Sequence, residues 1–404
     1  GFDNWSNKMN QPKNDIIAAI AETIDIPESA YEKAIARAKD LETWVKESSE
    51  SAKFDPAISA QGSFRLGTVN RPLKDDDEYD LDLSWLLRND YAKAQHSQAD
   101  LKALVGRDIE AYRRARKIET AREEKNRCWR LHYKDDLKFH LDGVPALPES
   151  LERKLAIRQA MQRFGIAEPL AQAVSNLSLN ITDRTRTDYH LLSSDWPLSN
   201  PEGFARWFES RMRLAVALLE GRAREARASS IDELPAYRWK TPLQRAVQFL
   251  KRHRDVMFDA NPDAQPISII ITTLAARAYQ GESDAASAIE RILTDMGKFV
   301  NQSRPRVPNP VNPEEDFADK WDTIEGRRLQ LEQNFWLWVE QAKADFLKIT
   351  TSSDPQFISD QARARFRATV DPVELRRKLG VGFPNVVVTP KTVPITEPAR
   401  PWRA

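Results

Sequence analysis

The spacing of hydrophobic residues changes once along the chain, from a mixture of helical and strand-like patterns to helical patterns alone. Residues 28–52 carry Ala, Ile, Leu, Trp and Val at helical spacing, which predicts a long amphipathic helix. Strand patterns follow at 81–87, 127–133 and 137–147, and a helix is predicted through 99–118. Residues 134–136 separate the last two strands, which predicts a hairpin turn.

From about residue 150 onward the pattern is almost entirely helical. The predicted helices cover 150–163, 201–224, 240–258, 266–280, 284–301 and 324–347. This order of elements predicts an α+β fold, with a mixed-sheet lobe at residues 1–165 that includes the long N-terminal helix, and an all-helical lobe at 166–382. The proline-rich residues 383–404 are predicted to form an extended or mobile tail. A cleft between two lobes is a common position for an active site.

Composition narrows the class of protein. Hydrophobic residues make up 41% of the 404 residues, as in globular proteins, and no apolar run approaches the ~20 residues that span a bilayer. The single cysteine, Cys128, excludes a disulfide framework, and the five histidines show no metal-ligand spacing. The net charge of +1 does not favour a grip on long nucleic acid. We therefore expect a cytoplasmic protein with no membrane and no long nucleic acid among its partners.

An acidic strand carries the first sign of chemistry. In the segment EYDLDL (78–83), Asp80 and Asp82 fall on one face of a strand, while Leu81 and Leu83 point to the core. Two carboxylates separated by roughly 6–7 Å along a strand can share divalent cations, and magnesium suits such a pair because it also binds phosphates. A third acid, Asp142, lies on a later strand. If the two strands are neighbours, the three carboxylates converge on a pair of ions that could clamp a phosphoryl transfer.

A Gly–Ser pair precedes the acids at Gly62 and Ser63. Glycine lets backbone amides approach phosphate oxygens, and the serine hydroxyl adds a donor. A lone Asp–X–Asp or a lone Gly–Ser is common on protein surfaces and carries little weight. The combination of a Gly–Ser turn, an acid pair on an apolar-backed strand and a third acid on a later strand is far more specific. It indicates a site for a nucleoside triphosphate with magnesium.

At these residues the chain resembles the nucleotidyltransferase superfamily of poly(A) polymerases, 2′–5′ oligoadenylate synthetase and cyclic GMP–AMP synthase. Within it the chain most resembles the bacterial CD-NTases, the cyclic-oligonucleotide synthases of CBASS anti-phage defence, near clades D and G. The matching segments run in family order from about residue 60 to 280: QGSFRLGT (61–68), EYDLDL (78–83), FHLDGVPAL (139–147), SDWPLSNPEGFARWF (194–208), TPLQRAVQFLKRHRD (241–255) and PISIIITTLAARAY (266–279).

The resemblance implies a polymerase-β-like lobe, a helical lobe of the oligoadenylate-synthetase kind and an active site between them. It implies that Asp80, Asp82 and Asp142 are catalytic and bind two Mg²⁺ ions, with Mn²⁺ as an alternative. It also implies a triphosphate site, for which the matching positions are Gln61, Gly62, Ser63, Lys251 and Ser268. Lys251 could equally be an exposed helical lysine. Arg65 and Arg71 could meet phosphate or only surface acids, and Tyr79, Tyr189 and Trp196 could stack on bases or belong to the core.

The activity implied is the joining of ATP and GTP, with release of pyrophosphate, into a cyclic GMP–AMP-type or related di- or trinucleotide. This second messenger would activate an anti-phage effector without direct contact. Two alternatives remain open: a template-independent enzyme that extends RNA or makes linear oligonucleotides, and an inactive nucleotide-binding sensor. Related synthases are also joined to targets through their C-terminus by a ubiquitin-transfer-like enzyme, which the tail ending at Ala404 would permit.

Overall fold

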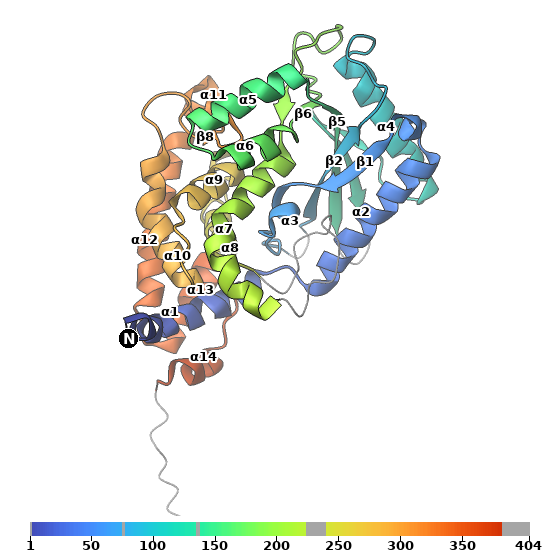
Figure 1. Ribbon diagram of the computed structural model, residues 1–404. Helices are drawn as coiled ribbons and strands as arrows, with labels where there is room; N and C mark the ends of the chain where they lie inside the picture. The colour runs from blue at the N-terminus through green and yellow to red at the C-terminus, as the bar shows by residue number, and fades with distance from the viewer. Residues whose placement is uncertain (1, 75–76, 135–137, 224–239, 382–404) are drawn as a thin grey trace, which may run out of the picture.

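Two lobes lie side by side in the structure, a computed structural model that describes residues 2–74, 77–134, 138–223 and 240–381 (Figure 1). For residues 2–10 and 214–223 only the backbone is described. One lobe is built on a mixed β-sheet and the other on helices, which confirms the predicted α+β class. Among the described residues, no helix is both long enough and apolar enough to cross a bilayer.

A seven-stranded sheet forms the first lobe. Its strands run in the order β1-β2-β5-β4-β3, with β6 beside β5 and β7 beside β6. The central strands β2 and β5 are parallel, and the other pairs are antiparallel. A separate hairpin joins β8 to β9. The strands are β1 (Pro56–Ala60), β2 (Tyr79–Leu87), β3 (Glu123–Glu124), β4 (Trp129–Tyr133), β5 (Phe139–Pro148), β6 (Leu179–Ile181), β7 (Leu198–Ser199), β8 (Pro308–Asn309) and β9 (Asn312–Asp316).

Helices supply most of the second lobe and cover the sheet of the first. They are α1 (Phe2–Ile24), α2 (Glu28–Ser48), α3 (Gly62–Leu66), α4 (Gln98–Ala115), α5 (Leu151–Arg163), α6 (Glu168–Ser175), α7 (Pro201–Ala223), α8 (Pro242–Met257), α9 (Ser268–Ala278), α10 (Ala285–Asp295), α11 (Ile324–Arg328), α12 (Leu331–Thr350), α13 (Pro355–Phe366) and α14 (Pro372–Leu379). Short 3₁₀ helices lie at Glu50–Phe54, Pro262–Ala264, Met296–Phe299 and Asp319–Asp322.

The apolar half of each central strand is buried beneath α2 and α4. Leu81 and Leu83 of β2, Leu131 of β4 and Leu141 of β5 belong to one core with residues of these two helices. Each of the four leucines is no more than 1% exposed. Because side chains alternate along a strand, the residues between these leucines must point to the opposite face of the sheet. That second face is polar.

The helical lobe has its own core, and α1 belongs to it. Ile16, Ile20 and Ile24 of α1 are buried in the same cluster as the apolar residues of α8, α10 and α12. Ile157 of α5 also lies in this cluster. The chain therefore starts in the helical lobe, builds the sheet and returns. The boundary at residue 165 stays a prediction. Helices α1 and α5 precede it in the chain but pack in the core of the helical lobe.

The predicted strands and helices are present, with changed ends. The helix predicted at 28–52 ends at Ser48, and the one predicted at 324–347 is divided at Gln330, which has a left-handed backbone (φ 56°). Residues 135–136 of the predicted hairpin turn lie outside the described residues, although β4 and β5 do pair antiparallel. The predicted tail at 383–404 also lies outside them.

Candidate active site

The three predicted aspartates lie together on the polar face of the sheet. In the parallel pairing of β2 with β5, Asp80 is opposite His140 and Asp82 is opposite Asp142. Directly paired residues of neighbouring strands point to the same face, so all four side chains share it. Asp80 is exposed, Asp82 is half-buried and Asp142 is only 6% exposed. The face therefore runs from a solvent-accessible carboxylate to a nearly buried one.

The chemistry of this face suits a divalent cation. Ligand atoms of Asp80, His140 and Asp142 lie within 4.8 Å of one another, and Asp82 stands beside Asp142 in register. Burial, together with the charges of Asp80 and Asp142, raises the pKa of Asp82 to about 7. Clustered carboxylates of this kind repel one another until a positive charge joins them. Carboxylate oxygens are the ligands that Mg²⁺ prefers, so the residues present fit the magnesium predicted from the sequence.

Gly62 allows the backbone to pass close to Asp82. A Cβ atom at this position would lie 2.4 Å from Oδ2 of Asp82, and the backbone of Gly62 is left-handed (φ 63°). The amide of Gln61 donates a hydrogen bond to the carbonyl oxygen of Asp82 (2.9 Å). Gly62 is the first residue of the short helix α3, where the sequence had predicted only a turn. The Gly–Ser segment is thus fastened directly to the acidic strand.

His140 lies between two carboxylates. Its Nε2 is 2.7 Å from Oδ1 of Asp80, and its Nδ1 is 3.2 Å from Oε2 of Glu78. Burial alone would lower the pKa of His140, but the contact with Asp80 outweighs it and the pKa is raised. Glu78 also contacts Nδ1 of His132 at 2.8 Å. A row of histidines and acids therefore continues the polar face beyond the aspartates.

Arg130 forms a two-point ion pair with Asp142. Its Nε and Nη2 each donate to one oxygen of the Asp142 carboxylate, both at 2.7 Å. The two residues are direct partners in the pairing of β4 with β5. Neither Arg130 nor His140 was among the predicted site residues. The alternation of polar residues in the sequences Arg130–Leu131–His132 and His140–Leu141–Asp142 is the signal that could have found them.

Helix α8 brings Lys251 to the residues that follow the Gly–Ser pair in the chain. The helix begins where Thr241 and Gln244 form a capping box and Pro242 occupies the first turn. Lys251 is 8% exposed, and its Nζ donates to the carbonyl oxygen of Thr68 (3.0 Å). It is thus not the exposed helical lysine that the sequence left open. Burial, and then the charge of Arg254, lower the pKa of Lys251 to about 8.

Ser268 starts α9 and is held by a neighbour of Lys251. Nη2 of the buried Arg254 donates to Oγ of Ser268 at 3.1 Å. The carbonyl oxygen of Pro266 also accepts a hydrogen bond from Arg254. Ser268 is therefore held by a residue of α8, the helix that also carries Lys251. Their role in binding phosphate stays a prediction.

Other residues named from the sequence have structural partners. Arg65 pairs with Glu202 of α7, and its Nε lies 2.7 Å from Oε2 of that glutamate. Tyr79, Tyr189 and Trp196 are no more than 8% exposed and lie in the core, so the structure favours the second of the two interpretations given for them. Arg71 is exposed, and its backbone oxygen accepts a hydrogen bond from Arg252.

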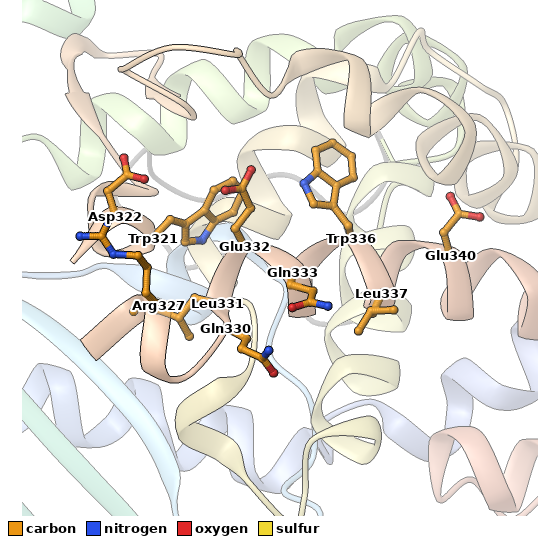
Figure 2. Close-up of a pocket in the computed structure, with 11 residues that line it drawn as sticks. Trp321, Asp322, Arg327, Gln330, Leu331, Glu332, Gln333, Trp336, Leu337 and Glu340 are labelled. Carbon is orange, nitrogen blue, oxygen red and sulfur yellow. The ribbon is translucent and has the colours of Figure 1, made fainter. Parts of the chain in front are cut away.

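A separate hollow lies on the helical lobe (Figure 2). It has a volume of about 650 Å³ and is lined by residues of α11, α12 and the segment before them, including Trp321, Leu331 and Trp336. No residue predicted for the active site lines it. We place the chemistry at the acidic face instead, because catalysis needs charged groups that converge and this hollow has none of the three aspartates.

A mixed sheet with two aspartates on one strand and a third on its parallel neighbour, next to a helical lobe, defines a nucleotidyltransferase of the polymerase-β-like class. A family model described as "Cyclic GMP-AMP synthase DncV-like, nucleotidyltransferase domain" matches residues 56–146, which run from β1 to β5. The matched segment contains the Gly–Ser pair and all three aspartates.

Relatives extend the match over most of the chain. A c-di-GMP synthase from Roseivirga ehrenbergii is 31% identical over 316 residues, which cover 76% of this chain and 72% of the relative. The cyclic dinucleotide synthase CdnG from Bradyrhizobium diazoefficiens is 23% identical over 339 residues, which cover 79% of this chain and 72% of that relative. The solved structure of that CdnG in complex with GTP has the same fold (TM-score 0.61, 19% identity, 91% of this chain and 98% of the other). This chain belongs to the CD-NTase family of cyclic oligonucleotide synthases, and its relatives place it near the G clade.

Proposed function

We propose that this enzyme joins two nucleoside triphosphates into a cyclic dinucleotide and uses Asp80, Asp82 and Asp142 as its catalytic carboxylates. The observation that carries the proposal is the register of β2 with β5, which sets Asp82 beside Asp142 on a polar face that also holds Asp80. GTP is the first substrate to test, alone and mixed with ATP, because the relative that is 31% identical is named a c-di-GMP synthase.

In the proposed reaction, a ribose hydroxyl of one nucleotide attacks the α-phosphorus of the other. A new P–O bond forms, the bond from the α-phosphorus to the bridging oxygen breaks, and pyrophosphate leaves. The same step, repeated on the remaining triphosphate of the linear intermediate, closes the ring and releases a second pyrophosphate. A carboxylate oxygen of Asp142 accepts the proton of the attacking hydroxyl.

The site residues also bind and orient the metal ions and the triphosphate. Asp80, Asp82 and Asp142 would hold the Mg²⁺ ions, for which Mn²⁺ could substitute. When bound, such ions neutralise phosphate charge and make the attacking hydroxyl more acidic. Lys251 and Ser268 from the helical lobe, with Gln61, Gly62 and Ser63 from the sheet lobe, hold the triphosphate. Most of the catalysis then comes from positioning and from charge stabilisation.

Replacement of one carboxylate tests this proposal. We expect Asp82→Asn to fold normally and to lose at least about a hundredfold in product formation with Mg²⁺ and labelled GTP, alone or with ATP. Asp77→Asn is the matched control, because Asp77 lies in the same acidic stretch but is exposed and bonded to the amide of Lys74. Normal turnover by Asp82→Asn would contradict the assignment of the site.

Product analysis separates the alternatives. A cyclic dinucleotide keeps its phosphates when treated with phosphatase, whereas linear products lose their terminal phosphates. Phosphatase-sensitive products would favour the template-independent nucleotidyltransferase. If no mixture of nucleotides released pyrophosphate, the inactive sensor would be favoured. Mass spectrometry of the resistant product then identifies its bases and ring size.

The biological role follows from the product. We propose a cytoplasmic enzyme whose cyclic dinucleotide acts as a second messenger in CBASS anti-phage defence and activates an effector at a distance. Joining of the C-terminus to a target by a ubiquitin-transfer-like enzyme stays a prediction, because residues 383–404 lie outside the described residues. Mass spectrometry of the protein from its native host tests it.

A further inference from the structure

The ion pair between Arg130 and Asp142 uses both oxygens of a proposed metal ligand. Nε of Arg130 donates to Oδ1 and Nη2 donates to Oδ2, each at 2.7 Å. This fork-to-fork geometry is the strong form of an arginine–carboxylate pair. Asp142 is only 6% exposed, so few directions of approach to its carboxylate remain. The guanidinium occupies one acceptor position on each oxygen, and the burial of Asp142 limits access to the positions that remain.

The backbone fixes this competition in place. Arg130 and Asp142 are direct cross-strand partners on β4 and β5, in the interior of a seven-stranded sheet. The backbone of Arg130 therefore keeps the guanidinium within reach of the carboxylate whichever partner the carboxylate has. The side chain of Arg130 is 23% exposed, which leaves part of it in contact with solvent.

We propose that Arg130 competes with the divalent cation for Asp142 and thereby weakens the affinity of the site for metal. The inference rests on the proposed function, because it takes Asp142 as a metal ligand. It assigns Arg130 the part of a positioning residue that sets how readily the carboxylate becomes available. Metal binding then includes the cost of opening a two-point ion pair, and a variant that lacks the pair binds metal more tightly.

A rival explanation is that any nearby positive charge weakens metal binding through its field alone. Arg130→Lys distinguishes the two, because lysine keeps the charge but lacks the rigid fork that occupies both oxygens. If Arg130 competes for the carboxylate oxygens, Arg130→Lys binds metal more tightly than the wild type. If only the electric field of the positive charge matters, Arg130→Lys binds metal as the wild type does, and that result would overturn the inference.

The measurement is a titration of the full-length protein with Mn²⁺ alone, in which free Mn²⁺ is followed by electron paramagnetic resonance. We expect Arg130→Gln to lower the dissociation constant about tenfold, as loss of one charge-assisted pair implies, with Arg130→Lys in between. Arg127→Gln is the control. Arg127 lies three positions before Arg130 in the chain and also pairs with an aspartate at 2.7 Å, but this is the turn-forming Asp183. Its dissociation constant is expected to equal that of the wild type.

The outcomes separate this inference from the proposed function. If wild-type protein binds Mn²⁺ but Arg130→Gln binds it equally or more weakly, Arg130 does not compete with the cation. The proposed metal site is then unaffected. If the wild type binds no Mn²⁺ at all, the proposed function fails together with the inference. Should Arg130→Gln fold poorly by circular dichroism, the comparison of Arg130→Lys with the wild type decides alone.

Discussion

The contact between Gly62 and Asp82 shows how strongly a single residue constrains the site. The backbone of Gly62 lies so close to the carboxylate that a Cβ atom would stand 2.4 Å from Oδ2. Its left-handed backbone (φ 63°) independently disfavours any other residue. Glycine is therefore required twice here, by the backbone conformation and by the space beside the proposed catalytic acid.

Alanine substitutions can separate these two requirements. We expect Gly62→Ala to reduce turnover by about a hundredfold or more, because the displaced carboxylate loses its alignment. Gly380→Ala is the matched control: Gly380 has nearly the same backbone (φ 65°), but among the described residues no atom lies within 4 Å of a Cβ built there. It should cost about 1–2 kcal/mol of unfolding free energy and leave turnover unchanged. Equal turnover of the two variants would show that the close approach at Asp82 has no catalytic importance.

At this scale the sequence predicted the acids but not their partners. Asp80 and Asp82 stand two residues apart on an apolar-backed strand, so their shared face follows from strand geometry alone. Arg130 and His140 join them only through the register of three strands, Arg130 opposite Asp142 and His140 opposite Asp80. Register depends on which strands become neighbours, and this is a property of the whole sheet that local periodicity does not contain.

Among the elements, helix α8 links the two sides of the site. Gln244 donates to the carbonyl oxygen of Leu66, Gln248 to that of Val69 and Lys251 to that of Thr68. One face of the helix is thus hydrogen-bonded along the segment that follows the Gly–Ser pair. The lysine at the end of this row is buried, and that burial lowers its pKa to about 8.

The lowered pKa of Lys251 predicts a pH dependence of activity. Below about pH 8 the amine is charged, as its proposed role in binding triphosphate requires, and above it the charge is lost. The value of kcat/KM, which reports the free enzyme, should therefore fall about tenfold or more between about pH 7.5 and about pH 9.5. In Lys251→Arg the charge persists, so this fall should disappear, while Lys251→Met should be poor at every pH. Parallel profiles for the wild type and Lys251→Arg would mean that another group titrates.

The elements that the sequence missed share a physical cause. Helices α1, α3, α6, α13 and α14 and the strands β1, β3, β6, β7, β8 and β9 were not predicted. Strands β6 and β7 have only three and two residues, too few to show alternation. Strand β6 exists because β5 offers it an edge, and β7 pairs in turn with β6. Helix α1 contains Pro12 and is completed by packing on the distant helical lobe. Long periodic segments were predictable, and elements made by tertiary contacts were not.

In the whole molecule, the two lobes have separate cores but share polar contacts beside the active site. Arg65 of α3 joins Glu202 of α7 by two hydrogen bonds (2.7 and 2.9 Å) and Glu209 of the same helix by a third (2.7 Å). Helix α3 begins at Gly62, next to Asp82. The arginine thus fixes the Gly–Ser segment to the helical lobe, which carries Lys251 and Ser268.

A double-mutant cycle between Arg65 and Glu202 measures this link. The side chains are 18% and 34% exposed, so solvent screens the pair partly, and we expect a coupling of about 1 kcal/mol in the free energy of urea unfolding. The variants are Arg65→Gln, Glu202→Gln and the double mutant. Arg328 and Glu325, an exposed pair within α11, form the control cycle and should couple less. Because the link also aligns the residues proposed to bind triphosphate from the two lobes, both single variants should raise KM for nucleotide more than they lower kcat. A coupling no larger than that of the control pair would mean that the lobes are held by α8 and not by this arginine.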